Sequence, residues 1–126
     1  AARRRPQARS RAACCSHFTS DEAYRSTREL IERGTDFDGI MAASDVIAIS
    51  AIRAIVESGR RVPQDVSVVG FDDILLAEHA NPPLTTVRQE LEKGANALVD
   101  TAIAAIRGEN PSSTVLAPSL IVRASA

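Results

Sequence analysis

The segment Val66-Ser-Val-Val-Gly-Phe-Asp-Asp73 is a short apolar run that ends at two adjacent acids. Short apolar runs bounded by turn residues are typical of strands buried on both faces of a parallel sheet. The run Ile40-Met-Ala-Ala43 has the same form and ends at Ser44 and Asp45. Each run therefore predicts a buried strand with short polar side chains at its carboxyl end.

Amphipathic segments alternate with these two strands. Thr19 and Glu22 have the spacing of a helix capping box, and Gly34, Gly59 and Gly108 stand where helices commonly stop. Helices are expected over residues 21–33, 45–59 and 90–107, and extended segments over residues 84–87 and 114–122. This alternation predicts an α/β fold with a parallel sheet.

The composition excludes several classes of protein. The chain has 126 residues, of which 44% are apolar and 25% charged, and a formal net charge of −1. No apolar run approaches the ~20 residues of a membrane-spanning helix, so no membrane partner is expected. The two cysteines, Cys14 and Cys15, are neighbours, and they neither build a disulfide framework nor complete a zinc site.

Residues 1–17 differ from the rest of the chain. The first fifteen residues carry five arginines (Arg3, Arg4, Arg5, Arg9 and Arg11), no acid and no aliphatic side chain larger than alanine. We expect an arm without regular structure, or a stretch translated out of frame, followed by one domain over residues 18–126. A nucleic-acid-binding arm and a targeting segment are less favoured. A targeting segment would need an amphipathic apolar face, which is missing. Since the chain does not begin with Met, we expect a fragment or a processed product.

Two strand ends offer a candidate binding site. Ligands of open parallel sheets bind outside the carboxyl ends of the strands, where Ser44-Asp45 and Asp72-Asp73 are expected. A carboxylate there suits the neighbouring hydroxyls of a small polar ligand, because it accepts several hydrogen bonds. The alternative is structural and equally weighted: Ser44 caps a helix, and backbone amides satisfy the two loop acids.

Enzyme chemistry is not favoured by the motifs. The chain lacks a glycine-rich phosphate loop, a Cys-x-x-Cys pair and a Gly-x-Ser-x-Gly elbow, and neither His17 nor His79 has a partner at motif spacing. An acid pair after a strand also occurs in phospho-acceptor and magnesium sites. A phospho-acceptor site of the kind found in receiver domains also needs a lysine at the end of a later strand. The only lysine of the chain, Lys93, lies within an expected helix, so this kind of site is not favoured. We therefore expect no catalysis, no cofactor and no metal.

Five segments resemble the lactose/galactose repressor (LacI/GalR) family of transcriptional regulators: residues 38–45, 48–59, 62–73, 82–88 and 120–125. The similarity covers about Phe18 to Ser125. It implies an incomplete, periplasmic-binding-protein-like (type I) sensor domain. Such domains bind a small effector, expected here to be a sugar, between two α/β lobes and thereby change the affinity of a cytoplasmic regulator for its operator.

The resemblance also assigns roles to individual residues. Asp72 matches the acid that holds effector hydroxyls, and Phe18 matches an aromatic ring that packs against the effector. Ser44 stands where the family usually has Asn, and Asp45 matches the acid that follows it. Asp45 is expected either to cap the helix or to contact the effector, and neither role is favoured over the other. Leu91 falls at another position that lines the pocket.

Further implications concern partners. Ile49 and the segment near Ala80 fall on surfaces with which the family forms homodimers. DNA is read by a helix-turn-helix, which this sequence does not contain, and most of the first lobe is also missing. The helix over residues 91–106 would then lack a partner for its apolar face, so we expect a marginal or self-associating chain.

Two other functions stay open at this stage. One is a lobe of a transport-type periplasmic sugar-binding protein, and the other is an acid-dependent α/β enzyme.

Overall fold

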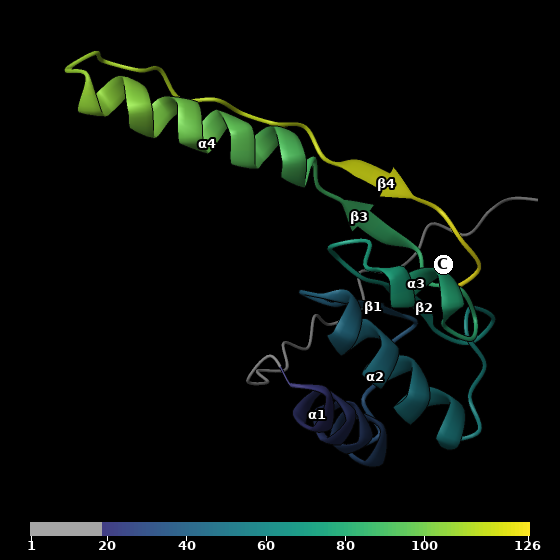
Figure 1. Cartoon of the computed structure of the whole chain (residues 1–126). Helices are drawn as coiled ribbons and strands as arrows, with labels where there is room; N and C mark the ends of the chain where they lie inside the picture. The colour runs from purple at the N-terminus through teal and green to yellow at the C-terminus, as the bar shows by residue number, and fades with distance from the viewer. Residues whose placement is uncertain (1–18) are drawn as a thin grey trace, which may run out of the picture.

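A computed structural model describes residues 19–126 of the chain. The Arg-rich segment and Phe18 lie outside the described residues. The elements alternate as expected (Figure 1): α1 (Ser20–Glu32), β1 (Gly39–Met41), α2 (Asp45–Glu57), β2 (Ser67–Val69), α3 (Leu75–His79), β3 (Thr86–Arg88), α4 (Leu91–Ile106) and β4 (Ser119–Ile121). The strands are shorter than the sequence predicts, and the short helix α3 was not predicted.

The expected parallel pairing is present between β1 and β2. Ile40 lies opposite Val68, and α2 forms the crossover between the two strands. A single parallel bridge joins Val69 to Thr85, and the Gly70 amide donates to the Thr85 carbonyl at 2.9 Å. The chain before β3 therefore continues the sheet beyond β2.

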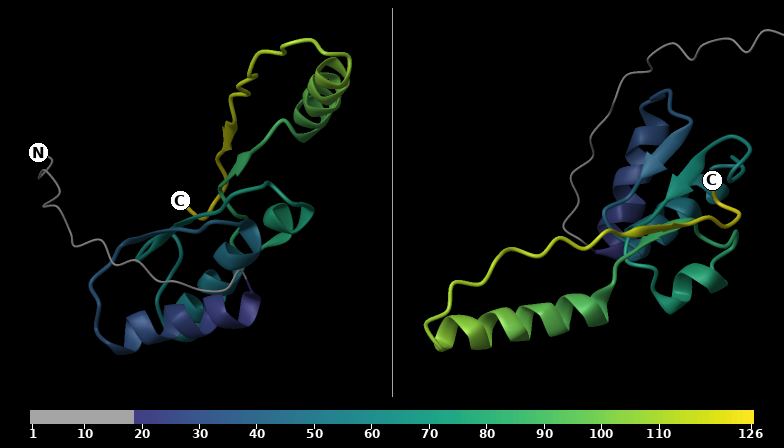
Figure 2. Two further views of the ribbon diagram at one scale, coloured as in Figure 1. Left: turned by 90° about the vertical axis from the view of Figure 1, so that its left-hand side faces the viewer. Right: turned by 90° about the horizontal axis from the view of Figure 1, so that it is seen from above.

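The pair β3 and β4 departs from the expected all-parallel arrangement. These strands are antiparallel, with Thr86 opposite Ile121 and Arg88 opposite Ser119. Figures 1 and 2 show the reason: the chain leaves the body along β3, forms α4 away from the body and returns along β4. An outgoing and a returning segment that lie side by side must run in opposite directions.

The core lies between α2 and the parallel strands. Its largest side chains include Ile55, Val66, Val68 and Leu84, none of which has exposed surface. Burial of a side chain such as Ile55 contributes about 1.5–3 kcal/mol to folding. Helix α1 packs on α2 through its buried residues Ala23 and Thr27. This core fixes the ends of β1 and β2, where the candidate site was expected.

Helix α4 has no buried residue. Its apolar side chains remain open to solvent, with Leu98 72% and Ile106 86% exposed. As the sequence led us to expect, nothing within residues 19–126 buries this apolar stripe: Leu91, Leu98, Val99, Ile103 and Ile106 are each at least 42% exposed. In the same residues, no helix is both long enough and apolar enough to cross a bilayer.

Candidate functional site

Asp72 directly follows the turn at the end of β2. Its amide donates to the Val87 carbonyl at 2.9 Å, and its Oδ1 accepts a hydrogen bond from Gln89 Nε2 at 3.1 Å. The side chain is half-buried. The partner of this carboxylate is therefore the side-chain amide of Gln89, just after β3. The structural alternative had predicted that backbone amides would bind this carboxylate.

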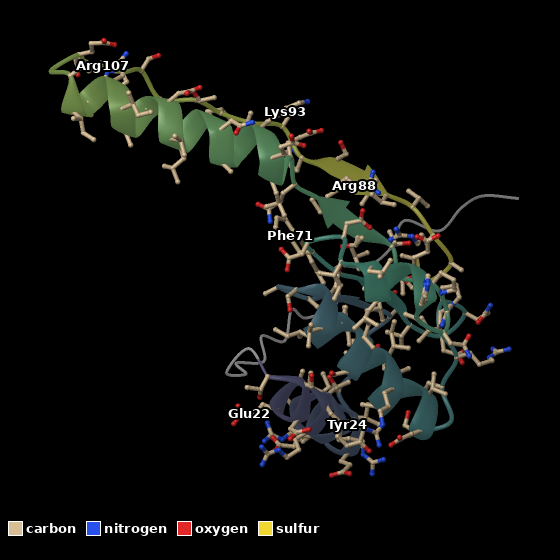
Figure 3. The ribbon with its side chains drawn as sticks, viewed as in Figure 1. Glu22, Tyr24, Phe71, Arg88, Lys93 and Arg107 are labelled. Carbon is tan, nitrogen blue, oxygen red and sulfur yellow. The ribbon has the colours of Figure 1, made fainter. Side chains whose placement is uncertain are left out.

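A hollow of about 290 Å³ adjoins this loop. Its lining residues come from the end of β2, the start of α4 and the segment before β4: Phe71, Gln89, Glu90, Leu91, Gly94, Ala95, Leu116 and Pro118. Figure 3 labels Phe71 where the body meets β3. Asp72 is not itself a lining residue, but it is joined to the hollow through Gln89. Leu91 is one of these residues, and its contact with an effector stays a prediction.

Asp73 has a different environment from its neighbour. Its side chain is only 6% exposed and forms ion pairs with Arg88 and, at 2.8 Å, with Arg123. Burial favours a raised pKa for this carboxyl, but the hydrogen bonds from Arg123 and Arg88 outweigh burial and hold the pKa below its ordinary value of 3.8. Asp73 is therefore held as a carboxylate, and guanidinium groups rather than backbone amides satisfy it.

Asp45 lies beneath the site and not on its surface. The residue is fully buried; its Oδ2 accepts from the Ile74 amide at 2.9 Å, and its Oδ1 accepts from the Thr86 hydroxyl. Its own amide donates to the Phe71 carbonyl at 2.8 Å. In contrast to the expectation that Asp45 binds an effector, its carboxylate has no exposed surface to offer. Its two oxygens instead bind Ile74, which follows Asp73, and Thr86 of β3. These contacts connect the Asp72–Asp73 loop to α2 and β3.

Ser44 is the N-cap of α2, because its Oγ accepts from the Ile47 amide at 3.4 Å. The half-buried side chain does not line the hollow described above. This hydrogen bond supports the role of Ser44 as a helix cap. Contact between Ser44 and an effector stays a prediction. Phe18, the expected aromatic partner of the effector, lies outside the described residues.

The two residues expected at a dimer interface lie on neighbouring elements. Ile49 of α2 and Ala80, just after α3, are both partly buried against the core. The same two helices expose Val46, Leu75 and Leu76, of which Leu75 is 76% exposed. An apolar surface is present there, and its use in a homodimer stays a prediction.

The family of periplasmic binding protein-like domains matches residues 1–126. The chain belongs to this family. The LacI/GalR resemblance and the periplasmic-binding-protein-like fold are confirmed, since the relatives found are LacI-type regulators.

Three comparisons with these relatives show how much of each relative the chain covers. The transcriptional regulator CelR of Thermobifida fusca is 44% identical over 110 residues, or 86% of this chain and 32% of CelR. The structure of a CelR–cellobiose complex has a TM-score of 0.79 at 42% identity, covering 86% of this chain and 34% of that one. The lac repressor dimer bound to operator and an anti-inducer has a TM-score of 0.81 at 31% identity, covering 86% and 33%. The chain spans about a third of the length of the curated relatives it matches.

Three residues of this periplasmic-binding-protein-like domain were not predicted as parts of the site. Gln89 contacts Asp72, while Arg88 and Arg123 contact Asp73. Gln89 and Arg88 are adjacent, so one short segment supplies a partner to each of the two acids. Figure 3 shows Arg88 on β3. No local spacing indicates such pairs, because the partners are 15 to 50 residues apart.

Proposed function

We propose that this chain is the effector-sensing and dimerising part of a LacI-type transcriptional regulator, with a sugar as the effector. The observation that carries the proposal is the placement of Asp72 at the end of β2, with one carboxylate oxygen on Gln89 and an open hollow beside it. A carboxylate and a side-chain amide together accept from and donate to sugar hydroxyls. Leu91 and Phe71 supply apolar surface for the faces of a sugar ring.

The relatives support a regulator over the alternatives. They are named as transcriptional regulators and repressors, and none of these names describes an enzyme or a transport protein. One of the similar solved structures is a CelR–cellobiose complex, so a saccharide is the first effector class to test. No catalysis is proposed, and Asp72 is assigned to binding alone.

The partners of the intact protein are part of the same proposal. We assign the homodimer contact to the surface around Ile49 and Ala80, with the exposed side chains of Leu75 and Leu76 beside it. Operator DNA would be bound through a helix-turn-helix outside the present sequence, which places the action of the intact protein in the cytoplasm. In residues 19–126, no group of three or more acids, histidines or cysteines could hold a metal.

A saccharide titration of the chain tests this proposal. We expect cellobiose to shift the amide resonances of residues 71–73 and 89–91 in ¹H–¹⁵N NMR spectra, which detect binding even in the millimolar range. Asp72→Asn should weaken that binding about tenfold or more, because hydrogen bonds to a charged group contribute about 1.5–3 kcal/mol. Asp100→Asn, on the exposed surface of α4, is the matched control.

Two results would contradict the proposal. One is the absence of any shift with cellobiose, lactose and ribose. The other is equal binding by the wild-type chain and by Asp72→Asn. Turnover of a saccharide that disappears in Asp72→Ala would instead support the enzyme alternative.

A further inference from the structure

The Asp73–Arg123 ion pair joins two parts of the chain that are 50 residues apart. Arg123 Nη2 lies 2.8 Å from Asp73 Oδ1, and the two side chains are 16% and 6% exposed. Such burial distinguishes this pair from the surface ion pairs of α1 and α2, whose side chains are at least 35% exposed. A shielded pair is screened less by solvent and salt, so it constrains its two segments more strongly.

Arg123 also binds the chain just before β3. Its Nη1 donates to the Leu84 carbonyl at 2.8 Å, and its amide donates to Thr85 Oγ1 at 2.9 Å. The guanidinium group therefore connects three segments: the loop after β2, the approach to β3 and the return from β4. Arg88 binds the same carboxylate from its other side but is 55% exposed.

The loop that Arg123 holds has an unfavourable backbone conformation. Asp72 has a φ of 114° and Asp73 a φ of 53°, and neither residue is glycine. Positive φ values are disfavoured for residues with a Cβ, and they persist only where surrounding contacts impose them. The contacts here are the Asp73 ion pairs and the hydrogen bond from the Asp72 amide to the Val87 carbonyl.

We propose that Arg123 is a positioning residue for the effector site, which by holding Asp73 keeps the Asp72 carboxylate on Gln89 beside the hollow. The part of this inference that concerns effector affinity rests on the proposed function. The part that concerns the conformation of the loop does not, because it follows from contacts within the chain.

Amide hydrogen exchange of the full chain tests the positioning role. The Asp72 amide reports on the loop, and the amide of the buried Ile55 in α2 reports on the body. In Arg123→Gln we expect exchange at Asp72 to accelerate about tenfold or more, with Ile55 changed less than about twofold, as for a local opening. Arg123→Lys keeps the charge beside Asp73 and should restore part of the protection. Arg107→Gln, on an exposed side chain, is the matched control.

The outcomes separate the alternatives. Equal acceleration at Asp72 and Ile55 would show a merely structural role, and unchanged exchange at Asp72 would overturn the proposal. If Arg123→Gln does not fold, Asp73→Asn gives the same comparison from the other side of the pair. Failure of both variants to fold would also overturn the proposal.

Cellobiose titration provides a second readout. Arg123→Gln should weaken binding about tenfold and Arg123→Lys less, although neither substitution changes a residue that lines the hollow. Equal binding by wild type and Arg123→Gln would overturn the effect on affinity. If the wild-type chain binds no saccharide, the proposed function fails, while the exchange experiment still decides the role of Arg123.

Discussion

Gly70 and Asp45 are so close that no side chain fits between them. A Cβ added to Gly70 would lie 2.3 Å from Asp45 Oδ1 and 2.8 Å from Leu84 Cδ2. The missing side chain lets the amino end of α2 approach the end of β2. Asp45 can therefore reach both Ile74 and Thr86.

We expect Gly70→Ala to destabilise the fold by about 1–3 kcal/mol, because overpacking of a filled interior displaces neighbouring atoms. Urea unfolding followed by circular dichroism measures the change. Gly39→Ala is the matched control, since its Cβ would meet no atom closer than the Ser67 carbonyl oxygen at 3.8 Å. Equal stability of the two variants would contradict the tight approach of Asp45 to β2.

Asp45→Ala should cost about 2–4 kcal/mol of unfolding free energy, since it leaves the buried partners of a carboxylate unsatisfied. The partners concerned are the Ile74 amide and the Thr86 hydroxyl. Asp100→Ala, at an exposed position of α4, is the control and should change stability by less than about 0.5 kcal/mol. A loss no larger in Asp45→Ala than in the control would show that Asp45 does not fasten the loop.

The apolar stripe of α4 predicts self-association. Leu98 and Ile103 are 72% and 42% exposed, and exposed apolar patches on stable monomers are small. We expect the double variant Leu98→Gln, Ile103→Gln to lower the weight-average mass in sedimentation equilibrium, with stability changed by less than about 1 kcal/mol. Arg25→Gln in α1 and Arg33→Gln at the C-cap of α1 form the control pair. A wild-type chain that sediments as a monomer at every concentration would contradict this prediction.

Asp65 predicts a pH-dependent contribution to stability. Hydrogen bonds from the Arg61 side chain and amide hold the pKa of Asp65 at about 2, below its ordinary value of 3.8. A lowered pKa in the folded state stabilises the fold above pH 3.8, and the contribution is lost as the pH falls through about 2. The stability difference between wild type and Asp65→Asn should therefore shrink from pH 5 toward pH 3. The control is Gln64→Ala, because Gln64 does not titrate and its stability difference from wild type should stay constant between pH 5 and pH 3. A stability difference for Asp65→Asn that also stays constant over this range would contradict the prediction.

Most of the helices could be predicted from the sequence. The long α4 was expected from its amphipathic pattern and from Gly108, and α2 from the Ser44 cap and Gly59. Capping groups and apolar periods are local, because they join residues three or four apart. The helix α3 was missed because five residues are too few to show an amphipathic period, and no side chain caps the helix. The antiparallel β3–β4 pair was missed because its partners are separated by the whole of α4.

The candidate site could be predicted only in part. The position of Asp72 at the end of a buried strand follows from the apolar run before it. The different roles of Asp72, Asp73 and Asp45 do not, since three acids at strand ends look alike in a linear pattern. Their partners are Gln89, Arg123 and Thr86, which lie 17, 50 and 41 residues away.

The linear order of apolar and polar residues was enough to establish an α/β chain with acids at the ends of its parallel strands, because each such feature depends on neighbours within one turn or one strand. Folding alone selected which acid binds Gln89 beside the hollow, which lies in the core and which is held by two guanidinium groups. Each of those outcomes depends on charges brought together from distant segments, and on the burial that decides whether a carboxylate meets water or a protein donor.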